Sequence, residues 1–199
     1  CNTLLIKLSP MFDISSALEV FPECKQVHVV SVKNECKELL LLVEGGFCGE
    51  TEVVCVDLDE LGVRSEELGI RSKEIILIVN YSVPKNYLYE PNASIMKAGL
   101  FKTVANKYNV QKLHPSTHLY TSEEFVPNFP GRSFEIKRVT KVQRKEIQDI
   151  EKANLSTRNF PGNVADLRKK LKLKDGGDVY IFACTLNDNS KVLIICEKC

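Results

Sequence analysis

The residues best suited to bind an anionic partner lie in one basic stretch of the chain. Residues 131–174 hold 13 lysines and arginines against 5 aspartates and glutamates, whereas the net charge of the whole chain is only +1. One basic module in an otherwise neutral protein indicates a local anionic partner, and nucleic acid is the usual one. The candidate nucleic-acid contacts in this module are Arg158, Asn159, Phe160, Arg168, Lys169, Lys170, Lys172 and Lys174.

Two interpretations of these residues stay open. In the functional one, Arg158 and the lysines neutralise phosphates, Asn159 reaches a base or a 2′-hydroxyl, and Phe160 stacks on a base. In the structural one, Phe160 enters the core, Asn159 or Asn163 caps a helix, and the lysines form a solvated face.

A second group of polar residues lies near the start of the chain. Lys7, Ser9 and Asp13 stand in or just after a predicted strand at 3–8. If that strand belongs to a parallel sheet, they lie at its carboxyl edge, where open α/β sheets place ligands, and are candidates for the edge of an active site. Alternatively, Ser9 and Asp13 form a turn and a helix cap.

The cysteines and histidines do not complete a metal-binding pattern. Cys196 and Cys199 form a C-x-x-C, but a structural zinc site needs a second knuckle or paired histidines. His114 and His118 are four residues apart, yet Pro115 disfavours a helix between them. Most of the eight cysteines lie in apolar, strand-like stretches. We therefore expect reduced thiols in a cytoplasmic protein, no metal, and no membrane association, since the apolar runs are too short for a span.

Hydrophobic periodicity predicts an α+β fold. Apolar runs and alternation predict strands at 3–8, 27–32, 36–43, 52–58, 73–80, 132–139, 153–157, 179–186 and 191–196. Helical spacing predicts helices at 13–20, 92–108, 142–150 and 164–173, with Asp13 and Asn92 as N-caps. Short polar connections predict hairpins at 33–35 and 187–190, and Gly176-Gly177 is expected to end the last helix.

The stretch Tyr87-Leu88-Tyr89-Glu90 offers two further alternatives. Glu90 and the tyrosine rings are either presented to a base or to a neighbouring domain, or the tyrosines pack in the seam between two domains while Asn92 caps the following helix. We expect the packing role, because large aromatic side chains contribute most of their stabilisation when buried.

The first residues predict that the chain continues a longer protein. The strand at 3–8 begins almost at once and without an initiator Met. The backbone groups of a strand need hydrogen-bonding partners on its edges. We therefore expect this chain to be the C-terminal part of a larger molecule.

Several multi-residue strings resemble one known family. They lie at 4–14 (LLIKLSPMFDI), 28–40 (HVVSVKNECKELL), 87–92 (YLYEPN), 96–99 (MKAG), 113–115 (LHP), 118–122 (HLYTS), 129–132 (FPGR) and 154–161 (NLSTRNFP). Together they extend over nearly the whole chain. It resembles a class I S-adenosylmethionine (SAM)-dependent methyltransferase-like family whose members carry ferredoxin-like and THUMP-like domains at the C-terminus.

This resemblance implies three parts. They are the terminal strands of a Rossmann-like methyltransferase sheet at 1–45, a ferredoxin-like α+β domain at 46–130 and a small THUMP-like α/β unit at 131–199. It also implies SAM as the cofactor of the full-length protein and RNA, such as tRNA or rRNA, as the partner. The family's Gly-rich SAM loop, ribose-binding acid and Asp-Pro motif have no counterpart in this chain. We therefore expect the chain alone neither to bind SAM nor to methylate. The alternatives are a non-enzymatic RNA-binding module and a protein-interaction or dimerisation domain.

Overall fold

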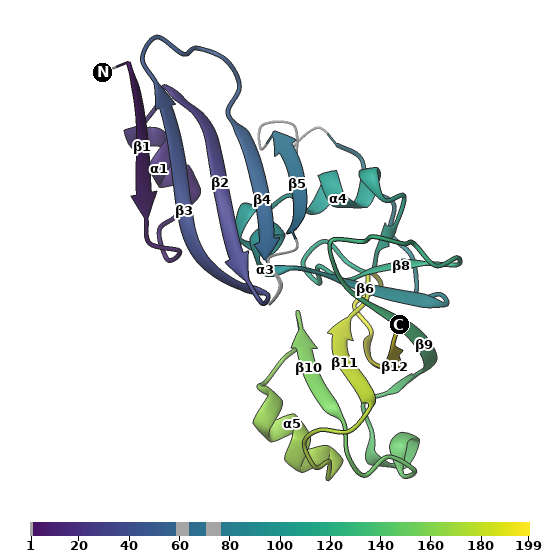
Figure 1. Cartoon of the computed structure of the whole chain (residues 1–199). Coiled ribbons are helices and arrows are strands. Elements are labelled where there is room, and N and C mark those ends of the chain that lie inside the picture. The colour runs from purple at the N-terminus through teal and green to yellow at the C-terminus, as the bar shows by residue number, and fades with distance from the viewer. Residues whose placement is uncertain (1, 59–63, 71–76) are drawn as a thin grey trace. The chain divides into compact units, whose positions relative to one another are not determined.

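The structure, a computed structural model, describes residues 2–58, 64–70 and 77–199. It divides into two compact units (Figure 1). Unit 1 consists of Cys1–Ile78 and Pro91–Lys107, and unit 2 of Val79–Glu90 and Tyr108–Cys199. The chain therefore leaves unit 1, starts unit 2, returns for two short helices and then completes unit 2.

Unit 1 is built on a mixed sheet. Its strands are β1 (Thr3–Leu8), β2 (Cys24–Val32), β3 (Glu35–Glu44), β4 (Glu52–Leu58) and β5 (Arg64–Ile70), in the spatial order β1-β3-β2-β4-β5 (Figure 1). Only β2 and β4 run parallel. The predicted hairpin between β2 and β3 is confirmed. Its turn residues Lys33 and Asn34 both have positive φ, as a tight type I′ connection requires.

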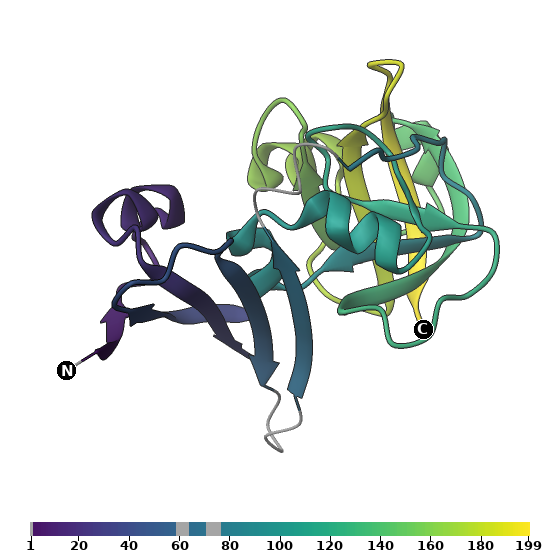
Figure 2. The same cartoon turned by 90° about the horizontal axis from the view of Figure 1, so that it is seen from above.

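Helix α1 (Ile14–Val20) begins where the sequence predicts it. The Asp13 carboxylate accepts a hydrogen bond from the Ser16 amide at 2.9 Å and caps the helix. Ile14 and Ala17 are buried, and the helix lies on the β1 side of the sheet (Figure 2). Because β1 forms the edge of the sheet, its outer backbone groups have no neighbouring strand among the described residues.

The single helix predicted at 92–108 is wrong in one respect, because two helices occupy this stretch. They are α3 (Ala93–Ala98), capped by Asn92 as predicted, and α4 (Phe101–Lys107). Gly99 adopts a left-handed conformation with φ 74° and terminates α3. Of the apolar residues that predict the inward face, Ile95, Leu100, Val104 and Ala105 are buried and Met96 is partly buried.

Unit 2 is organised around a second mixed sheet in the order β10-β11-β12-β9-β6-β8-β7. The strands are β6 (Tyr87–Pro91), β7 (Gln111–Lys112), β8 (Tyr120–Ser122), β9 (Gly131–Lys141), β10 (Asn154–Arg158), β11 (Val179–Thr185) and β12 (Lys191–Lys198). The predicted hairpin of β11 and β12 is confirmed by their antiparallel register. The helix predicted at 142–150 is only a 3-10 turn, η1 (Arg144–Ile147).

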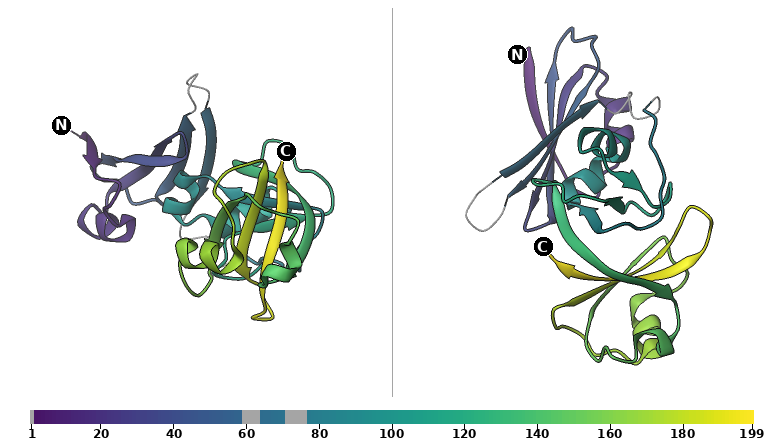
Figure 3. Two further views of the ribbon diagram at one scale, coloured as in Figure 1. Left: turned by 90° about the horizontal axis from the view of Figure 1, so that it is seen from below. Right: turned by 90° about the vertical axis from the view of Figure 1, so that its right-hand side faces the viewer.

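Helix α5 (Val164–Leu171) covers one face of this sheet (Figure 3). Leu167 and Leu171 point inward as predicted and pack with Ile181 and Leu193 of the sheet. Neighbouring residues of the same strands, such as Phe182 and Ile194, belong to a second cluster with Leu88 and Phe134. Successive strand residues face opposite sides, so β11 and β12 are buried on both faces, which explains their continuous apolar runs.

Two further predictions need correction or fall outside the described residues. Gly176-Gly177 does not end α5, because Lys172 already adopts the left-handed conformation that closes the helix. The strand predicted at 73–80 lies partly outside the described residues, and 77–80 are not strand. The strand that pairs with β4 lies earlier, at Arg64–Ile70.

The left-handed Gly99 gives a direct test of the break between α3 and α4. A Cβ added there would meet no atom within 4 Å, so Gly99→Ala should cost only the backbone strain, about 1 kcal/mol of unfolding free energy. Gly99→Asn should cost less, because asparagine tolerates this conformation. Urea unfolding followed by far-ultraviolet circular dichroism measures both, and equal costs for the two variants would contradict the assignment.

Candidate nucleic-acid interface

One carboxylate in unit 2 is buried against two arginines. The side chain of Glu90, in β6, is only 5% exposed. One of its oxygens accepts hydrogen bonds from Nε of Arg132 at 2.8 Å and from Nη2 of the same guanidinium, and the other accepts from Nη2 of Arg158. The three residues are far apart in the sequence, and the fold alone brings them together.

Both arginines are fixed and yet remain accessible. Each guanidinium side chain is 37% exposed. Arg158 also donates from Nη1 to the Thr157 carbonyl at 2.8 Å, and the Arg132 guanidinium lies 5.6 Å from the centre of the Phe134 ring. Since one carboxylate faces two guanidinium groups, the cluster keeps a net positive charge, and its unused N–H groups are available for an anion.

The residue that follows Arg158, Asn159, is exposed but held by hydrogen bonds. Asn159 has a positive φ of 49°, and its side-chain amide lies 3.1 Å from Nδ1 of His114. Its carbonyl accepts a hydrogen bond from the hydroxyl of Thr185. Asn159 is therefore a turn residue that ties the end of β10 to β11 and to the 114–117 turn.

The contacts of Phe160 and Asn163 favour the structural interpretation. Phe160 is partly buried against the core cluster beneath α5. Asn163, and not Asn159, caps α5, because its side-chain oxygen accepts from the Asp166 amide at 2.8 Å.

The lysines of the basic module are solvent-exposed. Lys169, Lys170, Lys172 and Lys174 are all exposed, and none has an ion pair within the part of the chain that the structure describes. Arg168 differs, since it pairs with Asp175 at 2.8 Å and donates to the Ala153 carbonyl at 3.3 Å. Four uncompensated ammonium groups thus lie on and just after α5, on residues other than the buried Leu167 and Leu171.

The candidates near the start of the chain belong to unit 1 and have local partners. Lys7 forms an ion pair with Glu38 at 2.6 Å on the exposed side of the sheet. The Ser9 hydroxyl accepts from the Met11 amide at 3.2 Å, and Asp13 caps α1. These contacts favour the turn-and-cap interpretation of Ser9 and Asp13.

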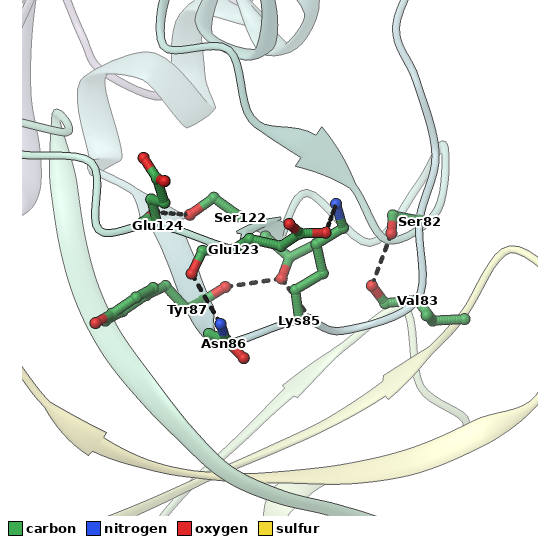
Figure 4. Close-up of polar contacts among 9 residues, drawn as sticks. Ser82, Val83, Lys85, Asn86, Tyr87, Ser122, Glu123 and Glu124 are labelled. Atoms are coloured by element: carbon green, nitrogen blue, oxygen red, sulfur yellow. Dashed lines mark hydrogen bonds and ion pairs between the residues drawn. The ribbon is translucent and has the colours of Figure 1, made fainter.

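The segment that leads into β6 is held against β8 (Figure 4). The Thr121 hydroxyl accepts from the Lys85 amide and donates to the Tyr87 carbonyl, each at 2.8 Å. Lys85 also pairs with Glu123 at 3.0 Å, and the Asn86 amide donates to the Glu123 carbonyl at 2.9 Å. This double attachment fixes the start of β6, whose end carries Glu90.

A buried lysine of β7, Lys112, lies beside a histidine, His118. Lys112 is 4% exposed, donates to the Pro115 carbonyl at 2.9 Å, and lies 3.5 Å from Nδ1 of His118. Burial, and then the nearby Lys112 charge and His114, lower the pKa of His118 to about 4. His118 is therefore neutral at physiological pH.

Within the described ranges, no group of three cysteine, histidine or acidic side chains is arranged to hold a metal ion. The seven cysteines of these ranges are free, and burial raises the pKa of Cys184 to about 12. No helix among the described residues is long and apolar enough to cross a membrane.

Comparison with known families identifies two parts of the chain. Residues 87–130 match a ferredoxin-like domain family, and residues 131–198 match a THUMP domain-like family. The chain carries a ferredoxin-like domain followed by a THUMP-like domain. Glu90 therefore lies in the ferredoxin-like domain, whereas both of its arginine partners and the α5 lysines lie in the THUMP-like domain.

A solved structure extends the similarity to the whole chain. It is the crystal structure of a "putative methyltransferase" from Porphyromonas gingivalis W83, which is 32% identical and superposes with a TM-score of 0.93 over 100% of this chain. The chain spans 51% of that protein and corresponds to its C-terminal half. No curated protein sequence gives a significant match.

Arg158 and Glu90 are each candidates from the sequence, but the sequence predicts neither their pairing nor a role for Arg132. Glu90 is separated from Arg132 by 42 positions and from Arg158 by 68. No local pattern reports such a contact. The sequence contained one usable signal, since a glutamate next to a proline at the end of an apolar strand is rarely buried without a cationic partner.

The lowered pKa of His118 predicts a loss of stability in acid. The unfolded chain protonates this histidine near pH 6.5, whereas the folded chain resists protonation down to about pH 4. The contribution to stability is therefore complete above pH 6.5 and lost as the pH falls toward 4, by an amount on the order of 3 kcal/mol.

The variant His118→Asn tests this expectation and preserves the left-handed backbone at this position. Urea unfolding at pH 7.5 and pH 4.5 should show a smaller pH dependence for the variant than for the wild type. His28→Asn, on β2 of unit 1, serves as the control. If the wild type and His118→Asn lose equal stability in acid, His118 is not the responsible group.

Proposed function

We propose that this chain is the substrate-recognition portion of a SAM-dependent methyltransferase that acts on RNA, such as tRNA or rRNA, and that it is not catalytic by itself. The observation that carries this proposal is the coincidence of the THUMP-like match with the basic module. The residues of that match hold the exposed lysines of α5 and the two arginines on Glu90. Flexible ammonium groups and planar guanidinium groups are both common phosphate ligands.

The exposed lysines support RNA binding through long-range attraction. Lys169, Lys170, Lys172 and Lys174 lie within six positions of one another and lack neutralising carboxylates among the described residues. Such a concentration of charge attracts a polyanion, and releasing its counterions favours binding at low salt. Asp175, the nearest acid in sequence, is already paired with Arg168.

We also propose that residues 1–45 complete the sheet of a methyltransferase domain. The exposed apolar surface of unit 1 supports this proposal. Large apolar side chains are exposed on β1 and around α1: Leu4, Leu5, Met11, Phe12 and Val20. Leu5 is 68% exposed although it lies within a strand. Further strands packed beside β1 would cover this surface and pair its outer backbone groups. The Porphyromonas gingivalis protein has a further half that this chain does not span.

The residues present here do not fit SAM. The connection between β1 and α1 is Ser9-Pro10-Met11-Phe12-Asp13, which contains no glycine. A strand-to-helix turn that closely binds the phosphates of a dinucleotide or the carboxylate of SAM needs glycines so that the backbone can approach the ligand. We therefore propose that SAM binds to a part of the longer protein that this chain does not include.

The proposal for residues 1–45 predicts an uneven pattern of hydrogen exchange. Amides of β1 should exchange faster than those of β2, because β2 is paired on both edges and β1 on one. Exchange monitored by mass spectrometry after peptic digestion compares the two strands. Protection of β1 equal to that of β2 in this chain would contradict the view that it lacks a neighbouring strand.

The proposal for RNA predicts binding that depends on salt and on α5. A pool of structured cellular RNA should bind the chain, and Lys169→Ala/Lys170→Ala should weaken binding about fivefold at low salt while lowering the log–log salt slope by about 1.5. Fluorescence anisotropy across a sodium chloride series measures both quantities. Both lysines are exposed, so the fold is expected to persist.

The matched control is Lys191→Ala/Lys198→Ala, which removes two exposed charges from the same unit but outside the basic module. This variant should bind RNA as the wild type does. If the wild-type chain fails to bind RNA at low salt, the proposed RNA partner is wrong. If both double variants weaken binding equally, the attraction is not local to α5.

A further inference from the structure

We infer that Arg132 and Arg158, held by Glu90, form a preorganised binding site for a phosphodiester group of the RNA backbone. This inference rests on the proposed function and adds the residues that would set the geometry of binding. The two guanidinium groups converge on one carboxylate, so they lie side by side although they come from different strands.

The cluster of Glu90, Arg132 and Arg158 carries more positive than negative charge. Glu90 supplies one negative charge to two arginines, and it is the only ion-pair partner that either arginine has among the described residues. One positive charge is therefore left over at a partly buried position, where water screens it less than on an open surface. An anion bound there would neutralise the cluster.

Both guanidinium groups keep N–H donors that make no hydrogen bond within the part of the fold that the structure describes. A guanidinium carries five N–H groups in a fixed plane. Arg132 directs Nε and Nη2 to Glu90, and Arg158 directs Nη2 to Glu90 and Nη1 to Thr157. The remaining N–H groups belong to side chains that are 37% exposed. Two planar donors of this kind match the tetrahedral oxygens of a phosphate.

Both arginine side chains are held in place before any ligand binds. Each arginine has two anchors: Glu90 with the Phe134 ring for Arg132, and Glu90 with the Thr157 carbonyl for Arg158. An arginine side chain loses considerable rotational entropy when it is ordered. Here folding has already ordered both side chains, so a bound phosphate does not have to.

Charge-conserving variants test the inference. Arg132→Lys and Arg158→Lys keep the positive charge but lose the planar fork, so each should lower RNA affinity about fivefold with little change in salt slope. The matched control is Arg138→Lys. Arg138 also lies on β9, is 38% exposed and pairs with a carboxylate, that of Asp149, but this carboxylate is 64% exposed, whereas Glu90 is buried. It should bind RNA as the wild type does.

A measurement on the wild-type chain tests the site directly and does not depend on whether the variants fold. In nitrogen-15 spectra of the wild-type chain, the Nε–H signals of Arg132 and Arg158 should shift on titration with RNA and with sodium phosphate, whereas that of Arg138 should not. Circular dichroism establishes whether each variant is folded.

The outcomes separate this inference from the proposed function. If RNA binds the wild type and both Arg→Lys variants equally, and the arginine signals do not move, the arginine site is wrong and RNA binding stands. If RNA does not bind at all, the proposed function is wrong, and the phosphate titration alone decides the arginine site. Equal shifts of Arg138 would mark the response as general screening and overturn the inference.

Discussion

A carboxylate removed from water has to be neutralised, and in unit 2 this requirement falls on Glu90. Its two partners lie on β9, the neighbour of β6, and on β10, at the edge of the sheet. Four strand spacings separate β6 from β10, which would place them about 19 Å apart in a flat sheet. Arginine and glutamate side chains are too short to meet over that distance. The sheet must therefore coil until the end of β10 approaches β6, and the ion pair between Arg158 and Glu90 is compatible only with this curvature.

The same constraint links the two families that the sequence matches. Glu90 belongs to the ferredoxin-like residues, and Arg132 and Arg158 belong to the THUMP-like residues. The sheet is continuous across the change, since β9 of the THUMP-like domain lies between β12 and β6. The family boundary at 130 and 131 therefore falls within one hydrogen-bonded structure. Unit 2 is better understood as a single folded body than as two separate domains.

The elements that could be predicted from the sequence are those with local causes. The hairpin turn at Lys33-Asn34, the caps Asp13 and Asn92, and the inward face of α5 all depend on residues within a few positions of one another. The errors arose where one residue's backbone angle decided the outcome. Gly99 divides a continuous apolar period into two helices, and Lys172 closes α5 although the glycines that usually do so come later. Apolar spacing carries no information about either angle.

The candidate site was predictable only in part, for a related reason. Lysines clustered in sequence are clustered in space whenever they lie on one helix, so the exposed charge of α5 follows from the sequence. The role of Arg158 does not, because its partner Glu90 is 68 positions away. Tyr89 shows the same limit: its hydroxyl is 2.8 Å from that of Ser122, and it accepts from the Val126 amide at 2.9 Å. The expected packing role of this tyrosine therefore includes an unforeseen polar network.

The two kinds of positive charge in the THUMP-like domain differ in what they can contribute. The lysines of α5 are long, exposed and without fixed partners, so they attract a polyanion without setting its orientation. The arginines on Glu90 are held in place, and a fixed fork distinguishes a correctly placed phosphate from a misplaced one. Pairing with Glu90 does not remove Arg158 from an RNA-binding role, because it consumes only part of the guanidinium. A carboxylate that orients two arginines would convert attraction for an anion into a defined position for it.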